Sequence, residues 1–155
     1  YARGKNINGA SFIQADVHHL PFRDSCIDQI ISAEIVEHVS RPELMLNEIR
    51  RVLVPDGEVV ITTPNERSIW GIYELLWDFF GRGRNYGETH LRFFSPRELS
   101  ALFSDFSSST IKTIFFLSPI FALTNSESLL NLGMKIDNYF EKRGMGVSIV
   151  LHAKK

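Results

Sequence analysis

Residues 27–63 read IDQIISAEIVEHVSRPELMLNEIRRVLVPDGEVVITT and decide the fold. Residues 27–33 carry β-branched isoleucines over too short a run for a helix, which predicts a buried strand. Residues 58–63 predict another strand, and the segment between them places apolar side chains on one helical stripe that ends in a turn at Pro55 and Gly57. A strand, a helix and a strand joined by short turns form a βαβ unit, whose strands are parallel and whose crossover is right-handed. The sequence therefore predicts an α/β fold.

The same short pattern, a capping box, marks two helix starts. Ser40 precedes Glu43 by three positions, and Ser95 precedes Glu98 by three positions. In this pattern the serine hydroxyl and the glutamate side chain each satisfy a free N–H at the start of the helix. A proline in the first turn costs nothing, because its missing N–H has no partner in a helix. We expect one helix to begin at each box.

The remaining elements follow from simpler patterns. Residues 11–16 alternate apolar and polar side chains, which predicts a short strand that leads into a loop at 17–24. Elsewhere, apolar residues at helical spacing predict helices and short β-branched runs predict strands. We expect helices at 68–80 and 126–142, strands at 110–117 and 147–152, and one domain over residues 1–155.

Composition narrows the class of protein. The chain has 155 residues, 44% of them hydrophobic and 23% charged, which is typical of one globular domain. Its 17 basic and 18 acidic side chains nearly cancel, so we expect no nucleic-acid partner. The single Cys26 forms no internal disulfide, and residues 1–5 lack the apolar core of a signal peptide, so we expect a cytoplasmic protein. His18 and His19 are adjacent rather than at metal-ligand spacing, so no metal site is expected.

Polar residues lie at the end of each predicted strand. Asp16 ends the first strand, Ser32, Ala33 and Glu34 end the second, and residues 63–65 follow the third. In an open parallel sheet, ligands bind beyond the carboxyl ends of the strands, where the loops carry polar groups. A carboxylate at such an end accepts a hydrogen bond from an exocyclic amine, so Asp16 suits an adenine-containing ligand. The alternative is that Asp16 caps its own turn.

Four short pieces of sequence, taken in order, resemble one enzyme family. They are Asp16-x-x-x-Leu20-Pro21-Phe22-x-Asp24, Asp28-Gln29-Ile30-Ile31, Glu37-His38-Val39 and Glu48-Ile49-Arg50-Arg51-Val52-Leu53-x-Pro55-Asp56-Gly57. Their order and spacing are similar to those of class I S-adenosylmethionine-dependent methyltransferases of the ubiquinone and menaquinone biosynthesis type. The similar region extends from Phe12 to Phe103. The resemblance implies an enzyme with S-adenosylmethionine as cofactor and a Rossmann-like, mostly parallel sheet.

The resemblance also implies cofactor-binding residues. Asp16 resembles the acid that meets the adenine amine, and the backbone of Val17 resembles the partner of an adenine ring nitrogen. Ser32, Ala33 and Glu34 resemble the segment that passes the methionine part of the cofactor. These are positions at or beside strand ends, where a ligand of a parallel sheet is expected.

Two histidines are catalytic candidates on the same resemblance. His38 follows Glu37 in a loop that faces the reacting methyl group, although both residues also suit the opening and capping of a helix. His90 resembles a histidine near the substrate and suits proton acceptance from a hydroxyl, because imidazole exchanges protons near neutral pH. A packed histidine that bonds its own loop is the alternative for His90.

The substrate side is expected in two helical insertions, at residues 66–95 and 119–144. Both insertions are rich in large apolar residues. The candidate substrate-side residues are Glu37, Trp70, Tyr73, Trp77, Tyr86 and Arg92. The insertions predict a small lipophilic or aromatic acceptor, reached from a membrane surface in one hypothesis. The alternative is that their apolar residues form the core.

The sequence departs from the family before Phe12. The family begins with a strand, a glycine-rich turn, a helix and a second strand, and these elements do not precede Phe12. We therefore expect an N-terminally truncated sheet without the first two strands and the glycine-rich loop, with exposed edges that favour self-association. Cofactor binding by such a chain alone is expected to be weak or absent. A non-catalytic binding or assembly module, or an inactive fragment, is the alternative function, whereas a nicotinamide-dependent oxidoreductase would need a glycine fingerprint that this sequence lacks.

Overall fold

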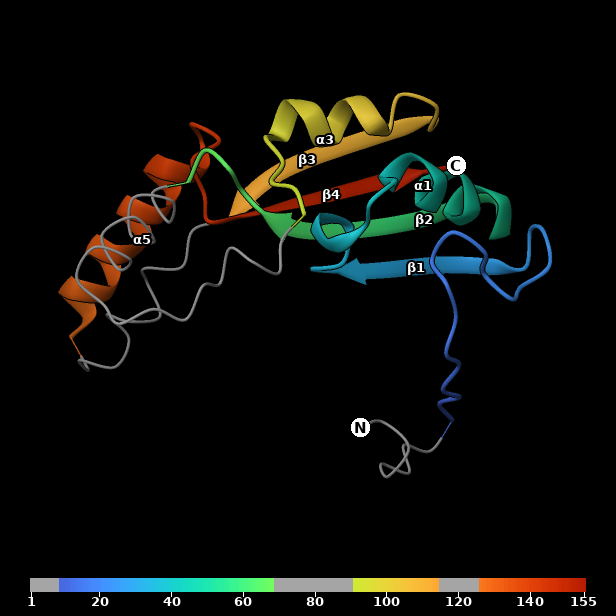
Figure 1. Cartoon of the computed structure of the whole chain (residues 1–155). Helices are drawn as coiled ribbons and strands as arrows, with labels where there is room; N and C mark the ends of the chain where they lie inside the picture. The colour runs from blue at the N-terminus through green and yellow to red at the C-terminus, as the bar shows by residue number, and fades with distance from the viewer. Residues whose placement is uncertain (1–8, 69–90, 115–125) are drawn as a thin grey trace, which may run out of the picture.

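The computed structural model describes residues 9–68, 91–114 and 126–155 (Figure 1). The elements in chain order are β1 (Ile27–Ala33), the 3-10 helix η2 (Val36–His38), α1 (Pro42–Val52), β2 (Leu53–Pro64), α3 (Pro96–Leu102), β3 (Ser108–Ile114), α5 (Glu127–Glu141) and β4 (Ser148–Lys154). The helix expected at 68–80 lies outside the described residues from position 69 onward.

The strands form one mixed sheet in the order β1-β2-β4-β3 (Figure 1). β1 and β2 pair in parallel and are joined through η2 and α1, which confirms the βαβ unit. β4 pairs antiparallel with both β2 and β3. The α/β class is therefore confirmed. In the part of the chain that the structure describes, however, only the first pair of strands is parallel, so the sheet is mixed rather than mostly parallel.

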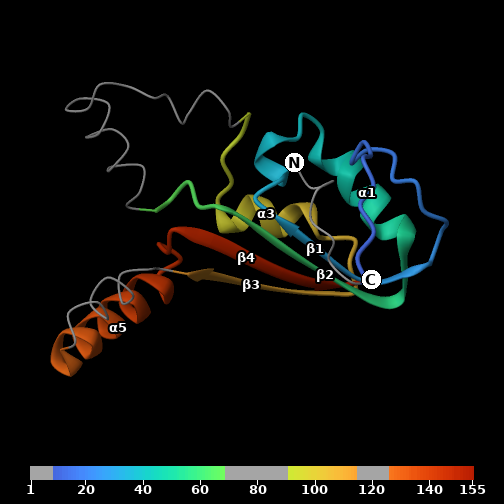
Figure 2. The same cartoon turned by 90° about the horizontal axis from the view of Figure 1, so that it is seen from below.

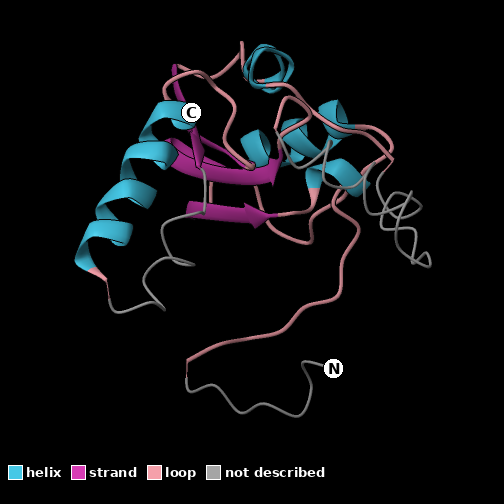
Figure 3. Cartoon of the chain, turned by 90° about the vertical axis from the view of Figure 1, so that its left-hand side faces the viewer, coloured by secondary structure: helices cyan, strands magenta, loops and turns pink. Residues whose placement is uncertain are grey.

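Helices α1 and α3 cover one face of the sheet (Figures 1 and 3). α1 buries the apolar stripe expected from its sequence, and complete burial of one such side chain contributes about 1.5–3 kcal/mol. The stripe belongs to one hydrophobic cluster with buried residues of β2 and β4. The buried apolar residues are Val36, Val39, Met45, Leu46, Ile49, Val52, Leu53, Val59, Ile61, Phe94, Leu99, Phe103, Phe106, Ile149, Leu151 and Ala153.

The two expected capping boxes have different outcomes. At α3 the box is complete, because Ser95 accepts from the backbone N–H of Glu98 and the Glu98 carboxylate accepts from the backbone N–H of Ser95 at 2.9 Å. At α1 the expectation for Ser40 is wrong. The N-cap there is Arg41, which makes no side-chain cap hydrogen bond. Because the helix begins one residue later than the box requires, Ser40 lies outside the capping position.

β2 begins earlier than expected, at Leu53. Ile27 of β1 pairs with Leu53, and Gln29 pairs with Glu58, so the register between the two strands shifts at this point. The turn expected at Pro55 and Gly57 is therefore an irregularity inside one long strand. Gly57 is required at this irregularity, because a Cβ atom there would lie 2.9 Å from the carbonyl oxygen of Val54. The start of β2 therefore follows directly from the end of α1.

The expectation of a strand at residues 11–16 is wrong. This segment is exposed and forms no ladder, and only Asp16 makes an isolated bridge, to His19 (Figure 1). A strand requires a hydrogen-bonded neighbour, and none of the described strands lies beside this segment. Alternation of apolar and polar residues alone does not supply one.

β1 is an edge strand of the described sheet. Ile31 in its middle is 78% exposed, although isoleucine is usually buried. An edge strand offers unpaired N–H and C=O groups to another chain. The exposed edge expected from the sequence is present, and self-association through it stays a prediction.

Helix α5 lies at the end of the sheet away from α1 (Figures 1 and 2). The chain passes from α5 into β4 at Ser148. There, β4 pairs with Pro64 of β2 on one side and with Ile114 of β3 on the other. The carboxyl ends of β1 and β2 point to the same end of the sheet. Among the residues that the structure describes, no helix has the length and apolar character needed to cross a membrane.

Candidate functional site

Glu34 is held at the carboxyl end of β1 by two hydrogen bonds to β2. Its backbone N–H donates to the carbonyl of Thr62 at 3.0 Å, and the Thr62 hydroxyl donates to Glu34 Oε1 at 2.8 Å. Its φ of 52° lies in the left-handed region, which costs a non-glycine residue about 1–2 kcal/mol. The fold therefore holds Glu34 in a strained conformation at the edge where a ligand of this sheet type binds.

Glu37 is buried beside it, in η2. The side-chain hydroxyl of Thr63 donates to Glu37 Oε2 at 3.0 Å. The other oxygen, Oε1, has no hydrogen-bond partner and lies 3.9 Å from Nε2 of His38. The Glu37 carbonyl accepts from the backbone N–H groups of Leu91 and Arg92. Glu37 thus connects η2 to the end of β2 and to the segment that begins at residue 91.

A second buried polar atom without a partner lies in β1. Ser32 is 3% exposed, and its Oγ makes no hydrogen bond. Of the three such side-chain atoms in the described part of the chain, two belong to Ser32 and Glu37, near the carboxyl ends of the parallel strands, and the third is Nε2 of His18. Buried polar groups nearly always have partners, so a water molecule or a polar ligand is expected at these atoms.

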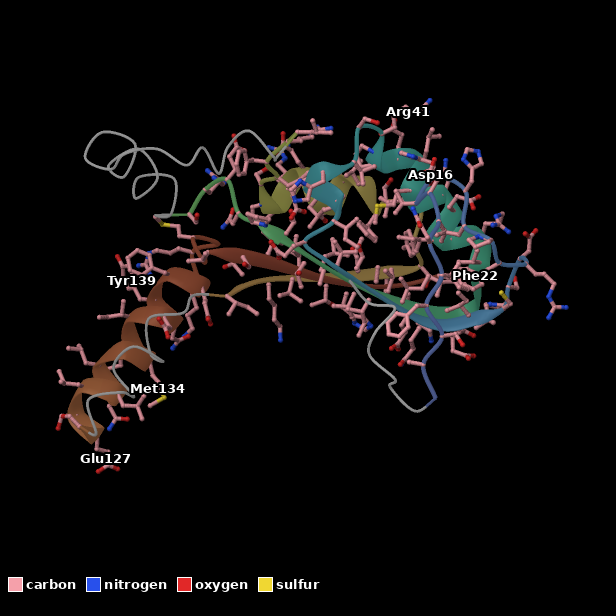
Figure 4. The ribbon with its side chains drawn as sticks, turned by 60° about the horizontal axis from the view of Figure 1, so that its bottom comes forward. Asp16, Phe22, Arg41, Glu127, Met134 and Tyr139 are labelled. Carbon is pink, nitrogen blue, oxygen red and sulfur yellow. The ribbon has the colours of Figure 1, made fainter. Side chains whose placement is uncertain are left out.

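Asp16 caps its own turn, as the local alternative predicted. The His18 backbone N–H donates to Asp16 Oδ1 at 2.9 Å, and His18 Nδ1 lies 2.8 Å from the same oxygen. These hydrogen bonds from His18 lower the pKa of Asp16, so its carboxylate stays ionised at neutral pH. Both contacts end on Oδ1, and the Asp16 side chain is 61% exposed beside α1 (Figure 4). Turn capping therefore leaves the carboxylate accessible to a ligand.

An ionic network fixes the loop that follows Asp16. Arg51 donates to both carboxylate oxygens of Glu48 at 2.8 Å, to Asp24 Oδ1 at 2.6 Å and to the carbonyls of Leu20 and Phe22. Glu48 Oε2 also accepts from the Leu20 backbone N–H at 2.9 Å. The Arg51 hydrogen bonds lower the pKa of Glu48 to about 2. Two of the sequence pieces that resemble the methyltransferases, at 20–24 and 48–57, are thus one structural unit.

The structure brings together only part of the expected site. Glu34, Glu37 and His38 share one end of the sheet, with Ser32 and Ala33 directly before them in β1. The hydrogen bonds of Asp16 and Glu34 go to different partners, and within the described residues no hydrogen bond joins the two. The guanidinium of Arg92 lies 5.1 Å from the ring centroid of Phe94. The expected residues Trp70, Tyr73, Trp77, Tyr86 and His90 lie outside the described residues.

Thr62 and Thr63 of β2 were not among the candidate cofactor-binding, catalytic or substrate-side residues, although Thr63 lies in the polar strand end expected at 63–65. Thr62 and Thr63 donate to Glu34 and Glu37 respectively. Their signal in the sequence is a hydroxyl pair at the carboxyl end of a strand, next to the polar residues already expected at that end. Within residues 9–68, 91–114 and 126–155, no group of three or more histidine, cysteine or acidic side chains is arranged to hold a metal ion.

Comparison with known proteins shows what the sequence and the fold are similar to. Residues 1–61 match the family described as a methyltransferase domain. The fold matches the crystal structure of an S-adenosylmethionine-dependent methyltransferase from Thermotoga maritima with a TM-score of 0.65 and 18% identity, over 95% of this chain and 65% of that one. The chain therefore has the fold of a solved S-adenosylmethionine-dependent methyltransferase. This confirms the fold that the resemblance implies, and the site residues chosen from it stay predictions.

Curated relatives resemble the chain over shorter stretches. The demethylmenaquinone methyltransferase of Thermotoga maritima is 33% identical over 109 residues, which are 65% of this chain and 48% of the relative. The fatty-acid O-methyltransferase of Mycolicibacterium smegmatis is 35% identical over 65 residues, which are 42% of this chain and 24% of the relative. The chain thus spans a half or less of the length of these relatives.

Proposed function

We propose that the protein transfers a methyl group from S-adenosylmethionine to a small lipophilic acceptor. The observation that carries this proposal is the carboxyl end of β1, where the strained Glu34 lies beside the buried, unpartnered oxygens of Ser32 and Glu37. A ligand with hydrogen-bonding groups satisfies such atoms. The fold supplies the class of ligand, because the solved protein that it resembles is an S-adenosylmethionine-dependent methyltransferase.

The candidate residues suit the groups of the cofactor. The ionised Asp16 accepts from the adenine amine, and the Val17 backbone bonds the adenine ring. Ser32, Ala33 and Glu34 hold the methionine part, with Ser32 Oγ as a hydrogen-bonding group that lacks a protein partner. S-adenosylmethionine supplies a methyl group already activated on a sulfonium sulfur, so the protein has to position the acceptor. Positioning contributes about 7–11 kcal/mol in favourable cases.

His38 and His90 are the candidates for accepting a proton from the substrate. The buried Glu37 carboxylate lies 3.9 Å from the His38 ring, and it is held in place by Thr63. An imidazole at this end of the sheet is a candidate to accept a proton from an acidic acceptor group. His90 is proposed for the same role from the substrate side.

The lipophilic acceptor is proposed from the insertions at residues 66–95 and 119–144. These insertions are rich in large apolar residues, and with the substrate-side candidates Glu37, Trp70, Tyr73, Trp77, Tyr86 and Arg92 they are proposed to contact the acceptor. The names of two relatives support this class, since one methylates demethylmenaquinone and the other a fatty acid.

Calorimetric titration of the protein with S-adenosylhomocysteine tests the proposal. We expect weak but measurable binding, and we expect Asp16→Asn to weaken it about ten-fold, because a charged hydrogen bond contributes about 1.5–3 kcal/mol. Asp105→Asn is the matched control, because Asp105 is an exposed aspartate in the loop after α3. An absence of binding heat in a protein with native circular dichroism would favour the non-catalytic binding or assembly module.

A further inference from the structure

Helix α5 exposes a row of large apolar side chains. Leu129, Leu132 and Tyr139 are 38%, 48% and 52% exposed. Their spacing along the helix places them on one side of it. Gly133 and Asp137 are the buried residues of the helix. The exposed row therefore contributes little to the core.

Basic side chains lie beside this apolar row. Lys135 follows Leu132 by three positions and Lys142 follows Tyr139 by three, so each lysine is a surface neighbour of an exposed apolar residue. Both lysines are exposed. The guanidinium of Arg143 lies 3.6 Å from the ring centroid of Tyr139 and donates to the Tyr139 carbonyl at 3.2 Å. One side of α5 thus combines apolar groups with three positive charges.

The negative charges of α5 lie elsewhere on the helix. Helical periodicity places Glu127, Asp137 and Glu141 away from the basic side. An apolar groove in another protein would bury the lysine ammonium groups at a high desolvation cost. A layer of anionic headgroups keeps the ammonium groups hydrated and paired while the apolar row enters the interface. The charge distribution therefore complements an anionic lipid surface better than a closed apolar groove.

α5 is fixed at the sheet end that carries the candidate site. Asn65, directly after β2, donates from Nδ2 to the carbonyls of Gly144 at 2.9 Å and Gly146 at 2.7 Å, just beyond the helix. The Thr113 hydroxyl donates to the Glu141 carbonyl at 3.1 Å. The other end of the helix, at Glu127, lies farther from the sheet (Figure 4). A surface bound by α5 is thus close to the carboxyl ends of β1 and β2.

We infer that the exposed side of α5 docks the protein on a membrane surface that contains anionic phospholipids. The row Leu129, Leu132 and Tyr139 enters the headgroup region, and Lys135 and Lys142 contact the lipid phosphates. The inference rests on the proposed function in one respect only: the benefit of docking at this end is that it brings a lipophilic acceptor to the candidate site. Binding to vesicles is measured without any methyl transfer, so the two proposals fail separately.

Vesicle flotation tests the inference. The probes are phosphatidylcholine vesicles with and without about one third phosphatidylglycerol, at low and at physiological salt. We expect flotation with the anionic vesicles, weakened by salt, and little with phosphatidylcholine alone. Lys135→Gln with Lys142→Gln is expected to reduce the partition coefficient about thirty-fold. Leu132→Gln with Tyr139→Gln is expected to abolish flotation.

The matched control removes the same charge from another surface. Arg97→Gln with Lys112→Gln changes two exposed basic residues of α3 and β3, and it is expected to float like the unchanged protein. Circular dichroism establishes that each variant is folded. The inference is overturned if the unchanged protein does not bind anionic vesicles, or if the α5 lysine variant binds as well as the control. Capture of a protein partner by α5 without vesicle binding also overturns it.

Discussion

Replacing Glu48 by glutamine should weaken the attachment of the loop after Asp16 to helix α1. The pKa of Glu48 falls from its ordinary value of 4.5 to about 2, first because Arg51 bonds its carboxylate and then because the Leu20 N–H does. Without screening by solvent, a pKa difference of this size means that the fold favours the charged over the protonated carboxyl by about 3 kcal/mol. The Glu48 side chain is 18% exposed and that of Arg51 is 32% exposed, so screening reduces the stabilisation to about 1–2 kcal/mol.

The sign of the pH dependence follows from the lowered pKa. The carboxylate of Glu48 stabilises the folded state fully above the unfolded pKa of 4.5, and this stabilisation is lost as the pH falls toward 2. Urea unfolding of the unchanged protein should therefore show a loss of about 1–2 kcal/mol across this pH interval that Glu48→Gln lacks. At pH 7 the variant should be less stable than the unchanged protein by the same amount.

Glu43→Gln is the matched control for this prediction. Glu43 lies in the first turn of the same helix and is exposed, so its charge contributes about 0.5 kcal/mol through the helix dipole. If Glu48→Gln costs no more free energy of unfolding than Glu43→Gln at pH 7, the network of Glu48 and Arg51 does not hold the loop. Persistence of the acid-dependent loss in Glu48→Gln would contradict the reasoning independently.

Three further changes test other parts of the structure. Thr63→Val removes the hydroxyl that donates to the buried carboxylate of η2, and it should lower the free energy of unfolding by about 2 kcal/mol, whereas Thr62→Val, next to an exposed carboxylate, should cost less than half of that. Ser95→Ala should cost about 1 kcal/mol in urea unfolding and Ser40→Ala close to nothing, and equal costs would refute the assigned caps. Ile31→Lys should shift the protein toward monomer in sedimentation velocity, because it charges the exposed edge strand, and an unchanged distribution would exclude that edge from self-association.

Local patterns in the sequence predicted the elements whose formation depends on local interactions. The helix at 42–52 followed from its apolar stripe, and the cap at Ser95 followed from a pattern four residues long. The prediction of a strand at residues 11–16 was wrong, because alternating apolar and polar residues indicate the two faces of a strand but not a neighbouring strand to pair with. The cap at Ser40 failed because capping depends on which residue first leaves helical dihedral angles, here Arg41.

Contacts between distant residues were beyond the sequence patterns. Thr63 and Glu37 are 26 positions apart, and only the parallel pairing of β1 with β2 brings them together. Likewise, Arg51 lies in the crossover helix α1 and bonds Leu20, Phe22 and Asp24. These residues precede it in the chain by 31, 29 and 27 positions. The resemblance to the methyltransferases pointed to Glu37 and to the segments that hold Arg51 and its partners. It did not predict the hydrogen bonds that connect these residues.

Chemical-shift mapping with S-adenosylhomocysteine tests the cofactor site most directly. In two-dimensional NMR spectra of the protein, the largest shifts should fall on Asp16, Val17 and residues 32–34, with smaller ones at Glu37 and His38. Binding that leaves these residues unchanged and instead shifts α5 or the outer strand β3 would contradict a cofactor site at the carboxyl ends of β1 and β2.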